Sequence, residues 1–246
     1  MHTRQTTTCM SALITGFGWV TANGYGRGRT GGAPLWQVGE PQPPTSILQT
    51  LNGGSRFGRL DLFSQIGVAA VALALEDAGH LGKTATYETP GNRELGLICA
   101  TTSSCKRTDH NFFKTVQADP RLASPGLFVY TLATSFLGET ALRFAITGTS
   151  LALMESQPAG AEALRIGLEQ LAYGDEELMV VGICNLFEKE ISGAPFFSGA
   201  LFLVIEKDQG EQTPFYATIS CDQKSNLYCN NQPCSDILSL ANMTVK

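Results

Sequence analysis

The segment around Gln157 has the order of residues that positions a nucleophile in many enzymes. A short buried run at 150–154 leads into a turn, and apolar residues at helical spacing follow from 159. A strand-to-helix turn presents one side chain at a helix N-terminus, where N–H groups and the helix dipole favour an anion and lower a thiol pKa. Here that side chain is an amide, which cannot form a thiolate or attack a carbonyl. The segment therefore predicts a nucleophile elbow that has no nucleophile.

The sequence also offers no evident general base for this elbow. Its three histidines are His2, His80 and His110, and none follows residue 110. His80 comes just after an expected helix and His110 lies in a polar stretch, so neither is tied by sequence to Gln157. We interpret both as surface or packing residues. Metalloprotease and P-loop motifs are absent from the sequence.

Cysteines and glycines suggest two further sites, and both have simpler interpretations. Cys221, Cys229 and Cys234 cluster near the end of the chain, but without a nearby histidine they favour reduced thiols over a zinc site. The stretch 26–31 matches GxGxxG, yet it is not placed between a strand and a helix, and Pro34 follows it. We interpret it as a flexible loop. The sequence therefore predicts no metal and no cofactor.

Composition limits the classes of partner. Net charge is −5 and charged residues make up only 16% of the chain, which argues against a nucleic-acid binder. No apolar run is long enough to span a bilayer, and residues 1–10 lack the apolar region of a secretory signal. We therefore expect a soluble, cytoplasmic protein without a membrane span.

Hydrophobic periodicity predicts strands that alternate with helices. A buried run at 60–78 repeats as an amphipathic helix, residues 106–146 hold helical segments broken at Pro120 and Pro125, and a further helix covers 159–173. Residues 21–58 indicate a loop-rich connection. The expected strands cover 12–20, 95–100, 150–154, 177–183, 200–205 and 215–219. This order predicts an α/β fold with a mainly parallel sheet and an antiparallel edge.

Several of these segments carry family motifs. The strand at Ala12–Thr21 is similar to V-V-I-T-G-x-G-x-V-[ST], and the helix before Gly79 ends in A-L-x-D-A-G. Other matches are Glu94–Thr101, Pro125–Thr134, Gly148–Leu153 and Gly174–Gly182. Together they resemble the N-terminal half of a β-ketoacyl synthase of the thiolase superfamily, over about residues 12–220.

The resemblance implies a fold and a division of the chain. It implies a thiolase-like half, layered α-β-α, with a mainly parallel five-stranded sheet and an antiparallel edge. Residues 1–220 would form the synthase-like N-terminal domain. Residues 221–246 would form a polar C-terminal tail of weak order, in which Ile237–Ala241 could dock as one helical turn.

Two departures from the family pattern bear on function. The elbow position that carries the acyl-accepting cysteine in the family is Gln157, and the two histidines that the family's C-terminal half supplies are missing. We expect that the residues after this region are too few to form such a half. Residues Glu155–Gly160 resemble the T-E-Q-A-G-G elbow of chain-length factors, and the short length resembles the corresponding subunit of aryl polyene clusters.

The resemblance therefore implies a non-catalytic subunit that pairs with a catalytic β-ketoacyl synthase as a heterodimer. It would shape the acyl tunnel of that partner in polyketide, aryl polyene or fatty-acid-like biosynthesis, and would meet acyl carrier protein only indirectly. Two alternatives stay open: a decarboxylase acting on malonyl carrier protein, and a homodimeric acyl-binding scaffold. Gln157 would either cap the helix or help to orient the dimer interface.

The same resemblance implies which residues meet the partner. The dimer interface would follow the strand before the elbow, at Ser150, Leu151, Ala152, Leu153 and Met154. Candidates for lining the acyl tunnel are Phe112, Phe113, Phe128 and Phe136, although each of these also fits a role in the core.

Overall fold

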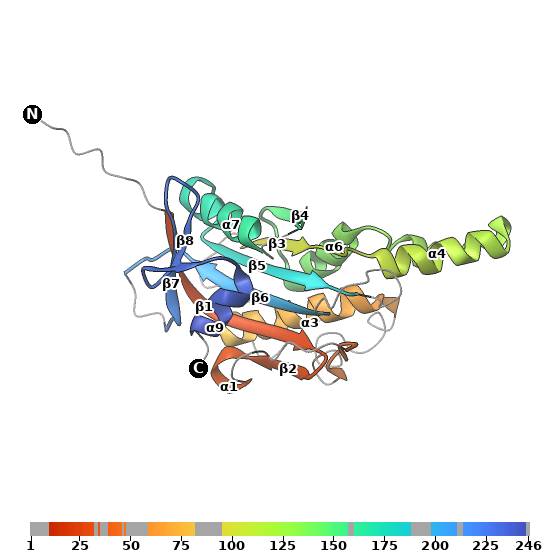
Figure 1. Ribbon diagram of the computed structural model, residues 1–246, viewed down its shortest axis with the longest axis horizontal. Helices are drawn as coiled ribbons and strands as arrows, with labels where there is room; N and C mark the ends of the chain where they lie inside the picture. The colour runs from red at the N-terminus through yellow and green to blue at the C-terminus, as the bar shows by residue number, and fades with distance from the viewer. Residues whose placement is uncertain are drawn as a thin grey trace, which may run out of the picture.

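A computed structural model of the chain describes residues 10–31, 34, 39–45, 47, 59–81, 95–156, 160–187, 198–210 and 214–244. These residues form one large sheet with helices on both faces (Figure 1). The strands are β1 (Met10–Thr21), β2 (Gly24–Arg27), β3 (Leu95–Thr101), β4 (Ser150–Met154), β5 (Leu178–Asn185), β6 (Gly199–Glu206), β7 (Ala217–Cys221), β8 (Leu227–Cys229) and β9 (Gln232–Cys234). The helical elements are α1 (Gly28–Gly31), α3 (Leu62–Asp77), α4 (Lys106–Ala118), the 3₁₀ turn η2 (Pro120–Leu122), α5 (Pro125–Phe128), α6 (Ala133–Phe144), α7 (Ala161–Tyr173) and α9 (Ile237–Thr244).

The order of the strands separates a parallel core from an antiparallel edge. Along the sheet the strands run β4-β3-β5-β6-β1-β7-β8-β9, and β2 pairs with β1. β3 is parallel to both β4 and β5, because helices cross between these strands. β6 is antiparallel to β5 and β1, so four of the five strands β4-β3-β5-β6-β1 point the same way. This confirms the expected mainly parallel five-stranded sheet, and β7, β8 and β9 form the antiparallel edge.

Helix α3 is buried on nearly all sides, not along one stripe as its amphipathic pattern suggested. Thirteen of its sixteen residues are buried. It packs on β1 and β6 on one side and on α6 and β2 on others. Close approach to β1 depends on Gly16 and Gly18, where an added Cβ would lie 2.4 Å from Ala74 O and 2.2 Å from Ala74 N. The helix is therefore an inner layer of the core.

The end of α3 is fixed to the sheet by a buried carboxylate. Asp77 Oδ2 accepts hydrogen bonds from Phe17 N at 3.0 Å and from Tyr216 Oη at 2.7 Å. Asp77 is the acidic residue of the Asp-Ala-Gly motif, and Gly79 ends the helix at φ +81°. This carboxylate therefore connects α3 to β1 and to the residue that precedes β7.

The Asp77→Ala variant should lower the free energy of unfolding by about 3 kcal/mol, because it leaves the buried Phe17 N–H without its acceptor. Tyr216→Phe is the matched control: it removes one of the two bonds and should cost about 1 kcal/mol. Chemical denaturation of the purified chain measures both values. Equal stability of the Asp77→Ala variant and the native chain would contradict this account.

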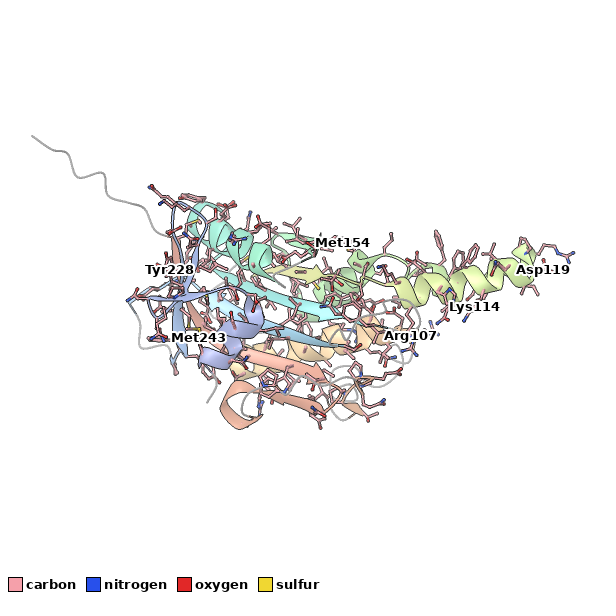
Figure 2. All side chains as sticks on the ribbon, viewed as in Figure 1. Arg107, Lys114, Asp119, Met154, Tyr228 and Met243 are labelled. Atoms are coloured by element: carbon pink, nitrogen blue, oxygen red, sulfur yellow. The ribbon has the colours of Figure 1, made fainter. Side chains whose placement is uncertain are left out.

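The segment after β3 forms an arm that projects from the body. Helix α4 runs outward, and its far end turns back through η2 and α5 (Figure 1). The residues Arg107, Lys114 and Asp119, which are labelled in Figure 2, lie along this arm. The expected breaks at Pro120 and Pro125 are confirmed, since each proline begins a new helical element.

Two segments are more ordered than their composition suggested. Within the loop-rich stretch, β2 forms a hairpin with β1, and the glycines at 26–31 lie in β2 and α1. Added Cβ atoms at Gly26 and Gly31 would meet the Trp19 ring at 2.5 and 2.8 Å, so these glycines serve packing. The expectation of a flexible loop was wrong at this position.

The polar segment after residue 220 also differs from the tail that its composition suggested. It forms β8, β9 and α9, and β8 and β9 extend the sheet beyond β7. Asn230 and Asn231 adopt positive φ and make the two-residue turn of the β8–β9 hairpin. The expected docking of residues 237–241 extends to a helix at 237–244, with Ile237 and Leu240 fully buried.

Candidate functional site

The expected elbow lies between the strand and the helix that were predicted on either side of it. β4 ends at Met154, and α7 begins at Ala161 after Gly160, which has a φ of +77°. The predicted strand and the predicted helix on either side of the elbow are therefore confirmed. Gln157 itself, with residues 158 and 159, lies outside the described residues.

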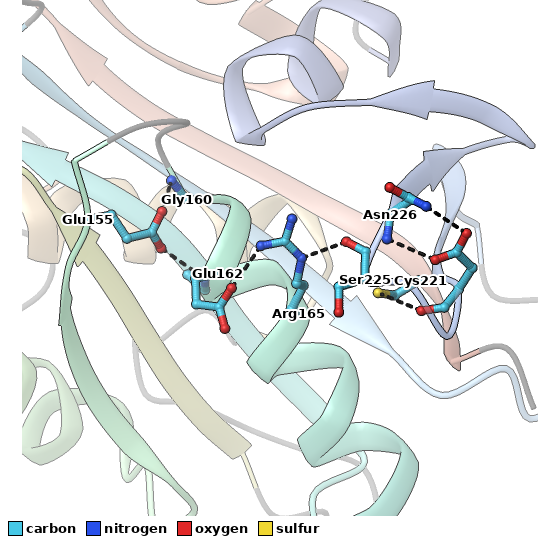
Figure 3. Close-up of polar contacts among 9 residues, drawn as sticks. Glu155, Gly160, Glu162, Arg165, Cys221, Ser225 and Asn226 are labelled. Carbon is cyan, nitrogen blue, oxygen red and sulfur yellow. Dashed lines mark hydrogen bonds and ion pairs between the residues drawn. The ribbon is translucent and has the colours of Figure 1, made fainter.

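The helix side of this elbow is capped by a carboxylate from the strand side. Glu155 Oε2 accepts a hydrogen bond from Gly160 N at 2.8 Å, and Glu155 Oε1 accepts one from Ala163 N at 3.0 Å (Figure 3). Burial raises the pKa of the Glu155 carboxyl above its usual range, and the N–H donors act in the opposite direction. The sequence analysis did not anticipate this cap; its signal was an acidic residue just before the turn.

The C-terminal segment packs against Gly160 and the first turns of α7. A Cβ at Gly160 would lie 2.5 Å from Ile237 Cδ1 and 2.8 Å from Ile183 Cγ2, so α9 and β5 enclose this glycine. On the next turn of α7, Arg165 Nε donates to Ser225 O at 2.8 Å, and its Nη1 pairs with Glu162 (Figure 3). Residues 221–244 thus hold the first half of α7 in place.

Hydroxyl and amide groups gather at the carboxyl ends of β3 and β5. Asn185 Oδ1 accepts hydrogen bonds from Thr101 Oγ1, Thr102 N and Thr102 Oγ1 at 2.8–3.1 Å. Ser103 Oγ accepts a further one from Leu186 N at 3.0 Å. The carboxyl ends of parallel strands are where α/β proteins bind ligands. The sequence analysis missed this cluster, whose signal was the Thr-Thr-Ser-Ser run after a buried strand.

The predicted interface residues Ser150, Leu151, Ala152, Leu153 and Met154 are the whole of β4. β4 pairs with β3 on one side, and no strand of the described residues pairs with its other side. Ser150, Leu151 and Met154 are exposed, Met154 to 65% (Figure 2), whereas Ala152 and Leu153 are partly buried against the two cores. The structure thus brings these five residues together at the outer edge of the sheet.

The four phenylalanines proposed for a tunnel separate into two groups. Phe136 is fully buried between Phe63 and Phe202, with ring centroids 6.0 and 5.8 Å away, so it belongs to the core. Phe112 and Phe128 contact each other on the arm, with ring centroids 5.4 Å apart. Phe113 and Phe128 are 54% and 61% exposed.

Exposed apolar side chains are concentrated in one stretch of the sequence. Of the eleven large apolar side chains exposed among the described residues, eight lie between residues 113 and 154. They come from the arm, from α6 and from β4: Phe113, Leu122, Phe128, Val129, Leu132, Leu142, Leu151 and Met154.

The two described histidines have roles outside the elbow. His80 is buried, and its Nε2 lies 2.8 Å from Glu206 Oε1, which also accepts a hydrogen bond from Thr15 Oγ1. His110 is exposed on the arm, and His2 lies outside the described residues. His80 is thus a packing residue, as expected.

Cysteine thiols in the described part of the chain are mostly buried. Burial raises the pKa of Cys99 well above its usual range and that of Cys234 to about 11, which disfavours reactive thiolates. Within the described ranges, no group of three or more possible metal ligands lies together. None of the helices described there is long and apolar enough to cross a membrane.

Solved structures with the same fold were found. The chain is similar to "The ishigamide ketosynthase/chain length factor", with a TM-score of 0.64 and 17% identity over 85% of this chain and 65% of that one. It is also similar to a type II polyketide synthase acyl-carrier protein in complex with its ketosynthase, with a TM-score of 0.65 and 16% identity over 86% and 68% of the chains. For a β-ketoacyl synthase from Burkholderia phymatum STM815 the TM-score is 0.58, with 17% identity over 85% and 63%.

These likenesses confirm the thiolase-like layered fold, and the chain spans only about two thirds of the solved chains it resembles. No protein with a curated function matches the sequence. The sequence model of the β-ketoacyl synthase N-terminal domain, however, matches residues 51–215, which is most of the chain. The chain therefore belongs to the β-ketoacyl synthase family, whose N-terminal domain it carries.

Proposed function

We propose that this chain is a non-catalytic, chain-length-factor-like subunit that pairs with a catalytic β-ketoacyl synthase in the cytoplasm. The observation that carries the proposal is the open edge of β4, which is lined by exposed apolar side chains next to an elbow without a nucleophile. The likeness to a ketosynthase/chain length factor supports the same role.

The edge of β4 needs a partner on physical grounds. Among the described residues this edge of β4 has no partner strand, and an unpaired edge with exposed Leu151 and Met154 is a template for pairing with another strand. Two related subunits that meet through β4 would join their sheets around a two-fold axis and cover both edges. A related synthase would supply the equivalent strand.

The arm supplies the second part of the proposal. It extends away from the sheet beside the β4 edge, so it would lie along the surface of a subunit bound there (Figure 1). The exposed rings of Phe113 and Phe128 would then face the partner and close one wall of its acyl tunnel. Side-chain volume at these positions would limit the length of the product, in polyketide, aryl polyene or fatty-acid-like biosynthesis.

Carbon–carbon bond formation would take place in the partner. The partner would hold the acyl group on its own cysteine and use its own histidines, while acyl carrier protein would reach this chain only through the complex. Gln157 replaces the thiol that an acyl group would need, and His80 is engaged by Glu206.

Co-expression with a β-ketoacyl synthase encoded near its gene should give a complex that co-elutes in size-exclusion chromatography. Addition of this chain should also lengthen the products that the partner makes from malonyl carrier protein, or restrict them to a defined chain length. A monodisperse monomer that associates with no such synthase would overturn the proposal. A stable homodimer would support the scaffold alternative, and carbon dioxide release by the chain alone would support a decarboxylase.

A further inference from the structure

The arm has few contacts that could fix its direction relative to the sheet. Helix α4 packs mainly on η2 and α5, which belong to the arm itself. Thr108 is the one buried residue of this helix, and it lies in the first turn, next to the body. Because apolar packing between α4 and the core is small, the direction of the arm depends on polar contacts at its base.

Thr108 is bonded to α3, the helix that forms the inner layer of the core. Its Oγ1 donates a hydrogen bond to Asp61 Oδ2 at 2.5 Å, a length typical of a hydroxyl bonded to a charged carboxylate. The other oxygen, Asp61 Oδ1, accepts from Ser64 N at 3.0 Å and caps α3. Asp61 is thus held by the core helix through one oxygen and holds the arm through the other.

Two other polar contacts at the base constrain the direction less. Cys105 Sγ donates to Thr131 O at 2.9 Å, but this bond joins the outgoing chain to the returning chain and leaves their common direction open. Arg107 pairs with Glu40 at 2.9 Å on the surface, where an ion pair contributes little. The bond between Thr108 and Asp61 is the one that connects α4 to a buried element.

We propose that Asp61, acting through Thr108, is the positioning residue that fixes the direction of the arm. It thereby sets where the exposed rings of Phe113 and Phe128 stand relative to the edge of β4. Their placement would determine the space left for an acyl chain, and this consequence for product length rests on the proposed function. The positioning role itself belongs to the isolated chain and is measured without a partner.

The test measures the distance from the arm to the body in the full chain. Spin labels attached through p-acetylphenylalanine at the exposed positions Lys114 on α4 (Figure 2) and Glu169 on α7 leave the native cysteines unlabelled. Double electron–electron resonance of the labelled chain should give one narrow distribution of distances. The Thr108→Val variant should widen it at least about 1.5-fold, because a hydrogen bond to a charged group that favours one direction is lost.

Three further variants separate this bond from a general loosening of the arm. Thr108→Ser keeps the hydroxyl and should keep the native width. Asp61→Ser retains a cap for Ser64 N but is too short to reach Thr108, so it should widen the distribution as Thr108→Val does. Thr115→Val is the matched control on the same helix: its hydroxyl makes its contacts within the arm, and its loss should leave the width unchanged.

A native distribution in either Thr108→Val or Asp61→Ser would overturn the inference. Equal widening would do the same in Thr115→Val, or in Tyr130→Phe, which removes the bond from Tyr130 Oη to Glu139 Oε1 where the chain returns to the body. Melting temperatures establish that the variants fold; Asp61 is only partly buried, so water can replace the lost hydroxyl.

These distances involve no synthase, so the inference can fail while the proposed function stands, and the proposed function can fail while the inference stands. In a complex with the synthase, Thr108→Val should give a broader range of product lengths than Thr108→Ser. Identical products from two complexes that both form would overturn the link between the direction of the arm and product length.

Discussion

A chain that ends after Cys221 should lose its stable fold. The deletion removes β8, β9 and α9, and with them the fully buried Ile237 and Leu240. Burial of each such side chain contributes about 1.5–3 kcal/mol. Together with Leu227 and Ala241 this approaches the total stability of an ordinary domain, about 5–15 kcal/mol. Gly160, Ile183 and the open edge of β7 would also become exposed to water.

Thermal unfolding followed by circular dichroism measures this effect. The control is a chain that ends after Thr244, which keeps α9 complete and should melt like the native protein. Ile237→Ala provides an intermediate case: it leaves a cavity behind Gly160 and should cost about 2–5 kcal/mol without preventing folding. An unchanged, cooperative melt of the chain that ends after Cys221 would show that residues 222–244 are dispensable.

The Met154→Arg variant should fold normally and should bind a synthase partner at least 100-fold more weakly. Met154 is 65% exposed in the isolated chain, so a longer charged side chain meets no obstacle there. In the proposed complex the guanidinium would be buried against apolar groups without a counter-ion. That costs about 3 kcal/mol or more, which corresponds to the stated loss of affinity.

Phe215→Arg is the matched control for this experiment. Phe215 is also exposed, at 53%. It precedes β7, which is separated from β4 by the strands β3, β5, β6 and β1 in the order of the sheet. Isothermal titration calorimetry with the co-purified synthase gives both dissociation constants, and melting temperatures establish that both variants fold. If the Met154→Arg variant bound the synthase as tightly as the native chain does, β4 would not be part of the interface.

Long buried elements were predictable from the sequence because their apolar patterns are strong. β3, β4, β5 and β6 each appear as an unbroken apolar run, and α7 repeats at helical spacing. The nearly completely buried α3 was predicted as a helix, but the prediction that it is buried along one stripe only was wrong. Its alanines and valines satisfy an amphipathic pattern, while glycines in a distant strand allow contact on its other side.

The missed elements are short and polar, and side chains or turns determine them. β8 and β9 have three residues each, so periodicity cannot reveal them, and the Asn230–Asn231 turn was the available signal. Asp222 adds to this order, because Asn226 and Lys224 donate hydrogen bonds to its carboxylate and lower its pKa to about 2. Such contacts depend on the folded geometry and leave little trace in composition.

The position of the elbow was predictable, but its electrostatics were not. Identifying Gln157 required only the motif spacing, whereas the cap by Glu155 depends on the angle at which the chain enters α7. The Asn185 cluster likewise requires the register between β3 and β5, which places Thr101 beside the end of β5. Register is a property of the assembled sheet, and one strand alone does not specify it.

The place of β1 in the sheet has a consequence for synthesis on the ribosome. β1 is the first strand of the described residues, and two of its sheet neighbours, β6 and β7, come from the last part of the described chain. Until they emerge, this long apolar strand is paired only with β2 at residues 18–21, and its remaining edge groups are open, which is a condition under which nascent chains aggregate or recruit chaperones. The central sheet is therefore completed only after β6 and β7 have emerged, and α9, which encloses Gly160, follows them.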